Sequence, residues 1–395
     1  MKTVTTRLGV LLAAGLWLSA ACTSSSPTAN DKTNAASRTT TSAAPATTSS
    51  TAAPAGCPKL RPPTEPAAPQ NLVDIQMVGP NKGFAVGRGA ILVTDDGHTW
   101  TPRYTGGAAF LSVDAVDDLH AWAVGDRALY ATVDGGKHWP GVGSPDDGTV
   151  LRQVHFVEEH FGWGVGRNGK LYRSGDGGHT WGDLMPPCGA EAVCFTSQEE
   201  GWVAVGNRIA HSTTGGDSWT PVFAVPGDAD VNGWHPQALQ CAKGGVVWAL
   251  FTGDNAALSH APYVVYRGTA DGQWTAVMKE GMTAPKEIQA RREGGSYPGP
   301  ISALGADSAA FVLFTPPVSP NPVSVMIGTN GGTVFGPGRP IPPLSSPTAA
   351  SFLNATAGWV LGTKIPPAPS VDAILATADG GQTWQEQYSR PSPTK

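Results

Sequence analysis

The stretch LYRSGDGGHTW, residues 171–181, leads from an apolar run into a tight glycine-rich turn and closes on a tryptophan. Copies of its last eight residues recur along the chain, six ending in tryptophan and one in phenylalanine. They end at Trp100, Trp139, Trp181, Trp219, Trp274, Phe335 and Trp384. The first four copies end 39, 42 and 38 residues apart, and this period is typical of propeller blades.

A second motif precedes most copies. Its forms are GFAVG at residues 83–87, AWAVG at 121–125, GWGVG at 162–166, GWVAVG at 201–206 and GWVLG at 358–362. An alternating segment such as VHFV or AVCF lies further upstream, so each unit is expected to contain four short strands. The repeat therefore predicts an all-β, seven-bladed β-propeller with four-stranded blades. The predicted blades span residues 71–106, 107–147, 148–187, 188–226, 236–280, 299–340 and 347–390.

The repeated turn has a structural explanation. Glycine supplies the positive φ angle that such a turn requires, and the aspartate side chain accepts hydrogen bonds from the turn's own backbone N–H groups. The predicted structural residues are Asp95, Asp134, Asp176, Asp379, Trp100, Trp139, Trp181 and Trp384. Eleven of the 13 tryptophans occupy the two repeated motifs, which makes them part of the architecture and not a sugar-binding platform. Trp17 and Trp234 are the other two.

The pattern S/T-x-D-x-G-x-T-W resembles the Asp-box of bacterial neuraminidase (BNR) repeats. Together with the GW-x-VG strand, it is similar to the photosystem II stability/assembly factor family of seven-bladed propellers. The resemblance covers residues 71–390, although the fourth copy has Thr214 in place of aspartate and the sixth has Asn330 and Phe335. Asp-boxes occur in sialidases, sortilin-type receptors and assembly factors, so the motif specifies the fold better than the function.

The N-terminus has the features of an export signal. Lys2 and Arg7 precede a short apolar run, and LSAAC at residues 18–22 resembles a bacterial lipobox, although Ser19 stands where leucine is usual. Residues 1–22 are thus predicted to be a lipoprotein signal peptide with Cys22 as the lipidated residue. Ordinary secretion or a retained anchor is the alternative. The expected location is extracytoplasmic, with the chain attached to the cell membrane by lipid.

Residues 23–66 are dominated by Ser, Thr, Ala and Pro and are predicted to form a disordered tether. The propeller is assigned to residues 67–390 and a short tail to 391–395. With Cys22 lipidated, four cysteines remain for two disulfides in an exported chain. The short loop favours Cys188–Cys194, which would leave Cys57–Cys241. The rival pair is Cys194–Cys241, because both residues fall on first strands of adjacent blades.

Two enzyme classes find little support in the sequence. A sialidase needs three arginines, a tyrosine paired with a glutamate, and an acid/base aspartate, and the FRIP-type arginine motif of that family is absent. Tyr130 and Tyr172 are expected to be strand residues. No cluster of His, Cys and Asp has the spacing of a zinc site, so no metal and no cofactor are expected. A sialidase-like or other glycoside hydrolase remains the alternative function.

Basic residues follow the second strand of five predicted blades. They are Arg88, Arg127, Arg167, Arg208 and Lys364. We call them the basic arc, because ring closure would bring them to one face. They are expected to bind a protein or peptide partner that carries acidic groups, as in the assembly-factor family that the chain resembles. The alternative is that they are simply solvated hairpin tips. The net charge of −5 gives no indication of nucleic-acid binding, and a monomer is expected.

The segments around Trp234 and around Arg291 and Arg292, at residues 280–300, depart most from the repeat. Insertions of this kind often form a partner-specific surface, although they are equally consistent with loops that have no role.

Overall fold

The computed structural model describes residues 71–185, 187–227, 233–242, 244–254, 261–269, 271–280, 297–314, 323–364 and 371–391. The chain divides into two units, Met1–Ala52 and Ala53–Lys395, and every described residue belongs to the second. The predicted signal peptide with Cys22, the whole predicted tether, Cys57, Arg291 and Arg292 lie outside the described residues. Within the described part of the chain, no helix is long and apolar enough to cross a membrane.

Every regular element in the described residues is a β-strand. The strands are β1 Leu72–Met77, β2 Gly83–Thr94, β3 Trp100–Ala115, β4 Ala121–Gly125, β5 Leu129–Thr132, β6 Leu151–Phe156, β7 Gly162–Gly166, β8 Leu171–Ser174, β9 Gly182–Leu184, β10 Ala192–Phe195, β11 Gly201–Val205, β12 Arg208–Ser212, β13 Thr220–Ala224, β14 Trp234–Ala242, β15 Val246–Gly253, β16 Tyr263–Gly268, β17 Trp274–Lys279, β18 Tyr297–Ala303, β19 Ala309–Phe314, β20 Ser324–Thr329, β21 Val334–Phe335, β22 Arg339–Pro340, β23 Leu344–Phe352, β24 Gly358–Lys364, β25 Val371–Thr377 and β26 Gln385–Pro391.

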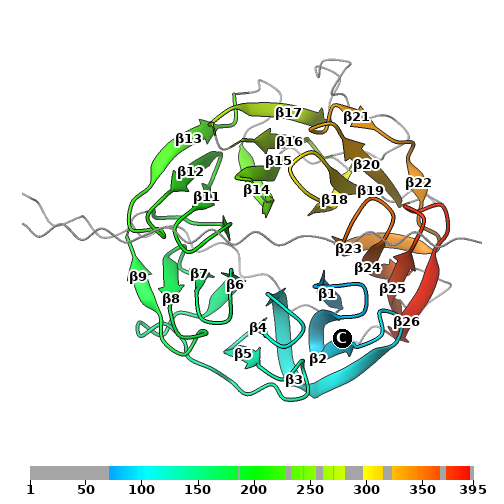
Figure 1. Ribbon diagram of the computed structural model, residues 1–395, viewed down its shortest axis with the longest axis horizontal. Helices are drawn as coiled ribbons and strands as arrows, with labels where there is room; N and C mark the ends of the chain where they lie inside the picture. Colours follow the sequence, from blue (N-terminus) through cyan, green and yellow to red (C-terminus); the bar gives the residue numbers. More distant parts are fainter. Residues whose placement is uncertain are drawn as a thin grey trace, which may run out of the picture. The chain divides into compact units, whose positions relative to one another are not determined.

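These strands form antiparallel sheets arranged as a β-propeller (Figure 1). The all-β propeller prediction is confirmed, but hydrogen bonding connects the described strands into six sheets, not seven. The difference lies in β3. Its residues 100–109 pair with β2 and its residues 110–115 pair with β4, so that one continuous strand joins β1 to β5 in a single five-stranded sheet.

The GW-x-VG segments are the most deeply buried strands. All five residues of β7 are buried, because both faces of this second strand are covered by neighbouring sheets. The Trp163 side chain is fully buried and stacks on Phe195 of β10, with ring centroids 3.5 Å apart and planes 4° from parallel. Trp122 stacks on Phe156 of β6 in the same way, at 3.6 Å and 3°. Tryptophan in one unit and phenylalanine in the next therefore form the core between sheets.

Trp234 also belongs to the core. It is the first residue of β14, is 6% exposed, and packs in a cluster with Trp202 and Phe251. The expectation that the segment around Trp234 forms a partner surface is therefore wrong for this side chain. The alternating pattern that identified the other first strands is interrupted here by Pro236, where the β14–β15 register shifts.

A ring of side-chain links joins the inner strands. In each case the linking residue lies opposite the buried position of the second strand, as Asp114 lies opposite Trp122 and His155 opposite Trp163. Each linking side chain bonds to the next unit one residue beyond the linking residue of that unit. Asp114, for example, bonds to Phe156, which follows His155. The links are Gln76 to Ala115, Asp114 to Phe156, His155 to Phe195, Cys194 to Cys241, Gln240 to Ala303, Ser302 to Phe352, and Ser351 to Met77. The last link returns to β1 and closes the ring.

Six of these links are hydrogen bonds and one is the Cys194–Cys241 disulfide, with Cα atoms 5.7 Å apart. The favoured pairing of Cys188 with Cys194 is therefore wrong and the rival pairing is correct. A short loop in sequence does not bring Cys188 to Cys194, because Cys194 points along the ring toward the next inner strand. Cys188 is itself disulfide-bonded, and Cys57 lies outside the described residues.

Candidate functional site

The Asp-box turns act as predicted for three of the four aspartates. Asp176 Oδ1 accepts hydrogen bonds from the Ser174 hydroxyl at 2.9 Å and the Thr180 N–H at 2.8 Å. Asp379 has the same partners, Thr377 and Thr383. In the second box His138 replaces the threonine, and its Nδ1 lies 2.6 Å from Asp134 Oδ2. These carboxylates are occupied within their own turns.

The first serine or threonine of the box has a role that sequence reasoning missed. The N–H of Gly178 donates to Ser174 Oγ at 2.8 Å, and Gly178 has a φ of 90° that an L side chain rarely adopts. The equivalent bond recurs from Gly136 to Thr132 and from Gly381 to Thr377. The hydroxyl thus stabilises the glycine in its positive-φ conformation. The recurrence of serine or threonine at the first position of the box was the sequence signal for this role.

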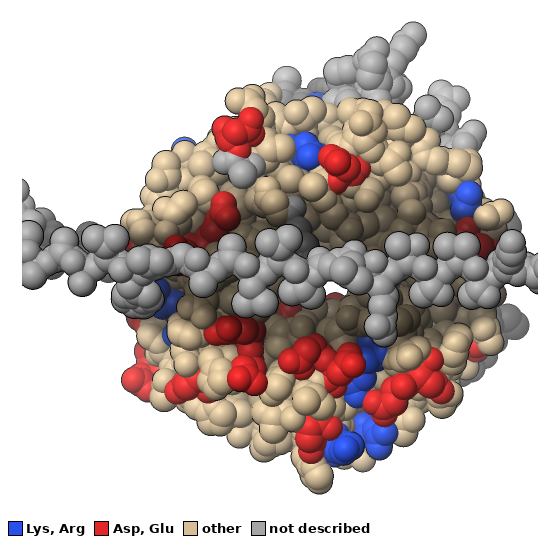
Figure 2. Space-filling model, viewed as in Figure 1, with Lys and Arg blue, Asp and Glu red and all other residues tan. Residues whose placement is uncertain are grey.

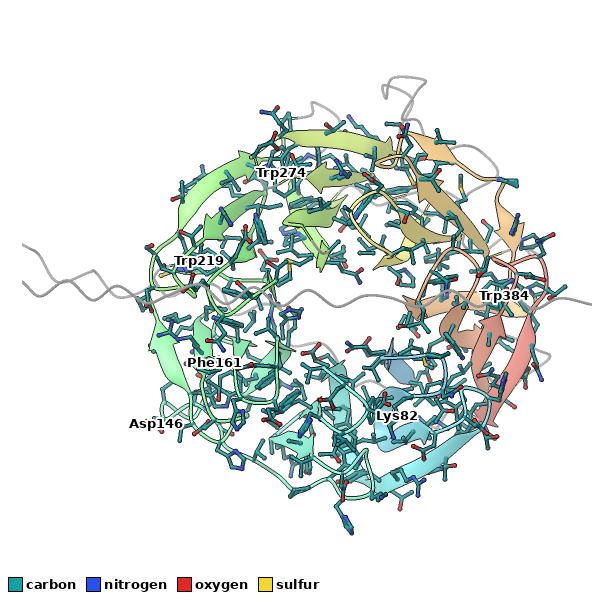
Figure 3. All side chains as sticks on the ribbon, viewed as in Figure 1. Lys82, Asp146, Phe161, Trp219, Trp274 and Trp384 are labelled. Carbon is teal, nitrogen blue, oxygen red and sulfur yellow. A yellow bond between two sulfur atoms is a disulfide. The ribbon has the colours of Figure 1, made fainter. Side chains whose placement is uncertain are left out.

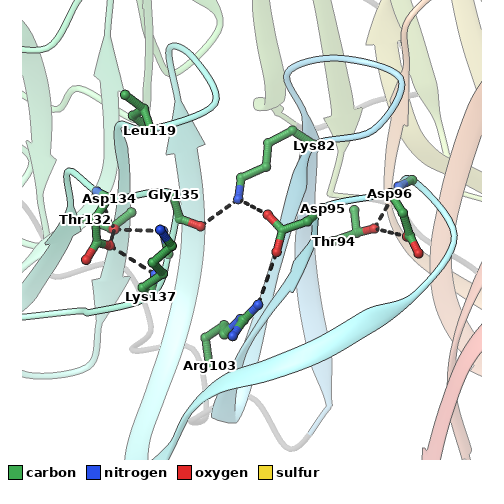
Figure 4. A network of polar contacts seen from close by, with 12 residues as sticks. Lys82, Thr94, Asp95, Asp96, Arg103, Leu119, Thr132, Asp134, Gly135 and Lys137 are labelled. Atoms are coloured by element: carbon green, nitrogen blue, oxygen red, sulfur yellow. Dashed lines mark hydrogen bonds and ion pairs between the residues drawn. The ribbon is translucent and has the colours of Figure 1, made fainter.

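The first box differs from the prediction. Asp96, and not Asp95, accepts hydrogen bonds from the Thr94 hydroxyl and from the N–H groups of His98 and Thr99 (Figure 4). This turn is one residue shorter than the others, so alignment on Trp100 selects the wrong aspartate. Asp95 instead forms ion pairs with Lys82 at 2.6 Å and Arg103 at 3.1 Å. The hydrogen bond from Lys82 lowers the pKa of the Asp95 carboxyl.

Box glycines also accept bonds from the preceding unit. The indole N–H of Trp122 donates to the Gly177 carbonyl at 2.8 Å, and that of Trp163 donates to Gly215 at 2.9 Å. Where the second strand has Phe84 in place of tryptophan, the buried Lys82 ammonium reaches the Gly135 carbonyl at 2.6 Å. Other donors at equivalent junctions are Gln387 to Gly97 and Arg339 to Gly380. The Asp-box is thus a contact between units as well as a turn.

The box tryptophans lie further out than those of the second strands. Trp100, Trp139 and Trp181 are buried, whereas Trp384 is half-buried. Figure 3 places Trp219, Trp274 and Trp384 toward the rim, where Trp274 begins β17 and the other two directly precede β13 and β26. All four predicted box tryptophans therefore pack against the protein, in keeping with their architectural assignment.

We expect Asp176→Ala to lower the free energy of unfolding by about 1 kcal/mol, because the Thr180 N–H and the hydroxyls of Ser174 and Thr180 lose their acceptor in a partly exposed turn. Desolvation opposes ionisation of Asp176, but the bonds from Thr180 and Ser174 leave its pKa below the usual value. A carboxyl with a depressed folded-state pKa stabilises above the unfolded-state pKa, and this contribution is lost as pH falls through the folded-state value. The difference from wild type, measured by urea denaturation, should therefore shrink between pH 5 and pH 2.

The control is Asp118→Ala, which removes an exposed carboxylate from a neighbouring turn. It should change the free energy of unfolding by less than about 0.5 kcal/mol at any of these pH values. Equal losses for the two variants would contradict the assignment of Asp176 as a turn residue.

The basic-arc residues lie at equivalent ends of the second and third strands. Arg127 follows β4, and its side chain is 92% exposed. Arg88, within β2, and Arg208, the first residue of β12, are also exposed. Arg167 is half-buried, and Lys364, at the end of β24, pairs with Glu386 at 2.6 Å. The arc is therefore uneven, with its most accessible cations on Arg88, Arg127 and Arg208.

The inner strands surround a central cavity of about 570 Å³, lined by polar side chains of the link ring and its neighbours. Burial raises the pKa of Asp74 to about 7 against the hydrogen bonds donated by Val113 and Ile75, and it also raises that of Asp114. No described residue lining this cavity is arginine or tyrosine. The side chains of a sialidase site therefore do not converge there. Tyr130 and Tyr172 are strand residues of β5 and β8, as predicted.

Within the described ranges, no group of three or more His, Cys, Asp and Glu residues is arranged to hold a metal ion. In the central cavity, Asp114 Oδ1 lies 3.9 Å from His155 Nδ1. Both residues are links of the ring, which accounts for their position.

The sequence matches a family model described as photosynthesis system II assembly factor YCF48 over residues 145–317. No curated protein sequence matches the chain. The solved structures with a similar fold include the following three. "YCF48 bound to D1 peptide" is 15% identical with a TM-score of 0.51, covering 76% of this chain and 92% of that one. YCF48 from Cyanidioschyzon merolae is 19% identical with a TM-score of 0.51, covering 80% and 97%.

The third structure, a GH74 xyloglucanase from Xanthomonas campestris, is 12% identical with a TM-score of 0.54, covering 81% of this chain and 68% of that one. At these identities structural similarity defines a fold and not an activity, since propellers carry unrelated functions. The family model and the repeated Asp-boxes both indicate a propeller of the BNR-repeat type. The chain is a β-propeller of BNR repeats that resembles the YCF48 assembly factors, most directly over residues 145–317.

Proposed function

We propose that the protein is a non-catalytic cell-envelope lipoprotein whose propeller binds an acidic protein or peptide through the basic arc. The observation that carries this proposal is the position of Arg88, Arg127 and Arg208, which are exposed at the same point of three units. One of the similar structures is a YCF48 protein bound to a D1 peptide, so a propeller of this kind is able to hold a peptide. The role that we infer is assembly or scaffolding.

Antiparallel pairing supports a single binding face. In every unit the connection between second and third strands lies at the strand end opposite the Asp-box turn, because successive strands reverse direction. The basic arc thus occupies one face and the boxes the other. Guanidinium groups pair with carboxylates in a planar, often bidentate geometry, which favours an acidic partner.

We also propose that the ring contains seven blades. The division of β3 between β2 and β4 supports counting the first sheet as two blades. The link ring supports the same count, since its seven links occupy equivalent positions and return to β1. The strand β2 also supports this count, because its first half pairs with β1 and its second half pairs with β3. The two halves meet near Gly89, which has a φ of 70°. Together with β1 and the first part of β3, they make a four-stranded unit.

The double variant Arg127→Glu with Arg208→Glu tests the binding face. We expect recovery of the acidic partner, crosslinked to the full chain on intact cells, to fall at least about tenfold, equivalent to about 1.4 kcal/mol. The fold should persist, because both side chains are exposed. Changing both residues to lysine should weaken capture less, since charge is retained and only the planar fork is lost.

The control is Lys137→Glu, which introduces one charge reversal of the same kind on an exposed Asp-box turn. Recovery equal to wild type in the arginine double variant, with unchanged melting, would refute the basic arc as the binding surface.

The lipid anchor is part of the same proposal. Its test is fractionation of a Cys22→Ser chain, which should leave the membrane fraction and lose acyl label.

A further inference from the structure

A cleft of about 400 Å³ lies between two consecutive Asp-box turns, on the face opposite the basic arc. Its walls come from the box after β5, the box after β8, and the turns that precede β4 and β7. Its lining combines the apolar residues Trp122, Ala131, Val133, Pro140 and Val142 with His, Asp and Glu side chains. The volume is within the range of small binding pockets in proteins.

The cleft has an apolar floor and an apolar lip. Trp122 and Ala131 form buried parts of the wall, and Pro140 and Val142 continue it outward. Val133 is 71% exposed at the rim, and Leu119 is 52% exposed on the adjoining turn. That turn is fastened to the box by the Gly135 N–H, which donates to the Leu119 carbonyl at 3.0 Å. Among the described residues, two of the three exposed large hydrophobic side chains, Leu119 and Val133, thus belong to turns that border this cleft.

Carboxylates surround this apolar surface. The four turns, at residues 116–120, 133–139, 157–161 and 175–181, contain six Asp and Glu residues and one cation, Lys137. Figure 2 shows many Asp and Glu residues over the lower half of the visible face, where Figure 1 places β1 to β9, with fewer Lys and Arg residues among them toward the right. The cleft is therefore complementary to positive charge.

Histidines hold two of the lining carboxylates in position. His120 Nε2 lies 3.2 Å from Glu159 Oε2, and its Nδ1 lies 2.9 Å from Asp117. The bond from His138 lowers the pKa of Asp134, so this carboxylate is ionised at neutral pH. Oriented carboxylates beside an apolar wall suit a lysine or arginine whose aliphatic stem lies along that wall.

We infer that this cleft binds a peptide segment in which an apolar side chain stands next to lysine or arginine. The apolar side chain occupies the space between Trp122 and Val142, and the cation meets Glu159 at the rim. This second binding site does not depend on the basic arc. The protein would thus present opposite charges on its two faces and join an acidic segment to a basic one.

The probe is a library of random heptapeptides displayed on phage and selected on the full chain. We expect enriched peptides to carry lysine or arginine beside an apolar residue. A synthetic peptide of the enriched sequence is then titrated against the variants by fluorescence anisotropy. Val133→Arg places bulk and positive charge at the mouth and should weaken binding at least tenfold. Glu159→Gln removes one rim charge and should weaken binding about threefold.

The matched control is Val334→Arg, because Val334, the first residue of β21 in another Asp-box copy, is also an exposed aliphatic residue, at 54% exposure. It should bind like wild type, as should Arg127→Glu with Arg208→Glu. Melting curves establish that each variant is folded. Enriched peptides without a basic residue, no enrichment over the Val133→Arg chain, or equal affinity of Val133→Arg and wild type would each overturn the inference. None of these results would bear on the basic arc.

Discussion

Trp163→Ala is expected to lower the free energy of unfolding by about 3–5 kcal/mol, the usual cost of removing a large aromatic side chain from a core. Trp163 has no exposed surface, and its ring lies flat on Phe195 of the next unit. The alanine variant would leave a cavity between two sheets that the surrounding strands cannot close, because β7 is held on both sides by hydrogen bonds. Equilibrium denaturation in urea measures the loss.

Two variants separate the contributions of Trp163. Trp163→Phe keeps an aromatic ring against Phe195 but removes the indole donor to Gly215, and it should cost about 1–2 kcal/mol. Trp219→Ala removes a half-buried tryptophan from the same cluster and should cost less than Trp163→Ala. A Trp163→Ala chain no less stable than the Trp219→Ala chain would contradict the assignment of the second-strand tryptophan as the main contact between units.

Removal of the Cys194–Cys241 disulfide is expected to lower the free energy of unfolding by about 2–4 kcal/mol. The two cysteines are 47 residues apart in sequence, so their bond restricts a long loop of the unfolded chain. The Cys194→Ser, Cys241→Ser double variant is a cleaner test than a reducing agent, because Cys188 is also disulfide-bonded. The midpoint of denaturation at pH 7, without reductant, is the measurement.

The neighbouring link supplies the comparison. Gln240 accepts a hydrogen bond from the Ala303 N–H at 2.7 Å and donates one to the Ile301 carbonyl at 3.0 Å. Gln240→Ala should lower the free energy of unfolding by about 1–2 kcal/mol, since two hydrogen bonds contribute less than a covalent bond between units. If the serine double variant were as stable as wild type, the disulfide would not serve as a closing link of the ring.

Local chemistry made part of this protein predictable from sequence. The Asp-box turn depends on residues within four positions of its aspartate, and the partners of Asp134, Asp176 and Asp379 all fall within that distance. The second strand could also be predicted from its own residues. A strand without polar residues must be covered on both faces, so the GW-x-VG motif indicates a buried inner strand. Repetition of both motifs at a blade-like period was sufficient to predict an all-β propeller.

Choices among similar residues required the tertiary structure. Whether Asp95 or Asp96 closes the first box depends on a turn shortened by one residue and on the position of Lys82, which is buried between two units. The continuity of β3 likewise depends on how two units meet, so the repeat alone did not reveal the five-stranded sheet.

The disulfide and the acidic cleft both depend on contacts between neighbouring units. Cys241 meets Cys194, and His120 meets Glu159, only because neighbouring units stand side by side in the ring. By itself, the sequence determined the turn and strand chemistry of each unit, since those contacts form between residues close along the chain. Only the tertiary structure decided which side chains meet across units, because those distances depend on the packing and closure of the whole ring.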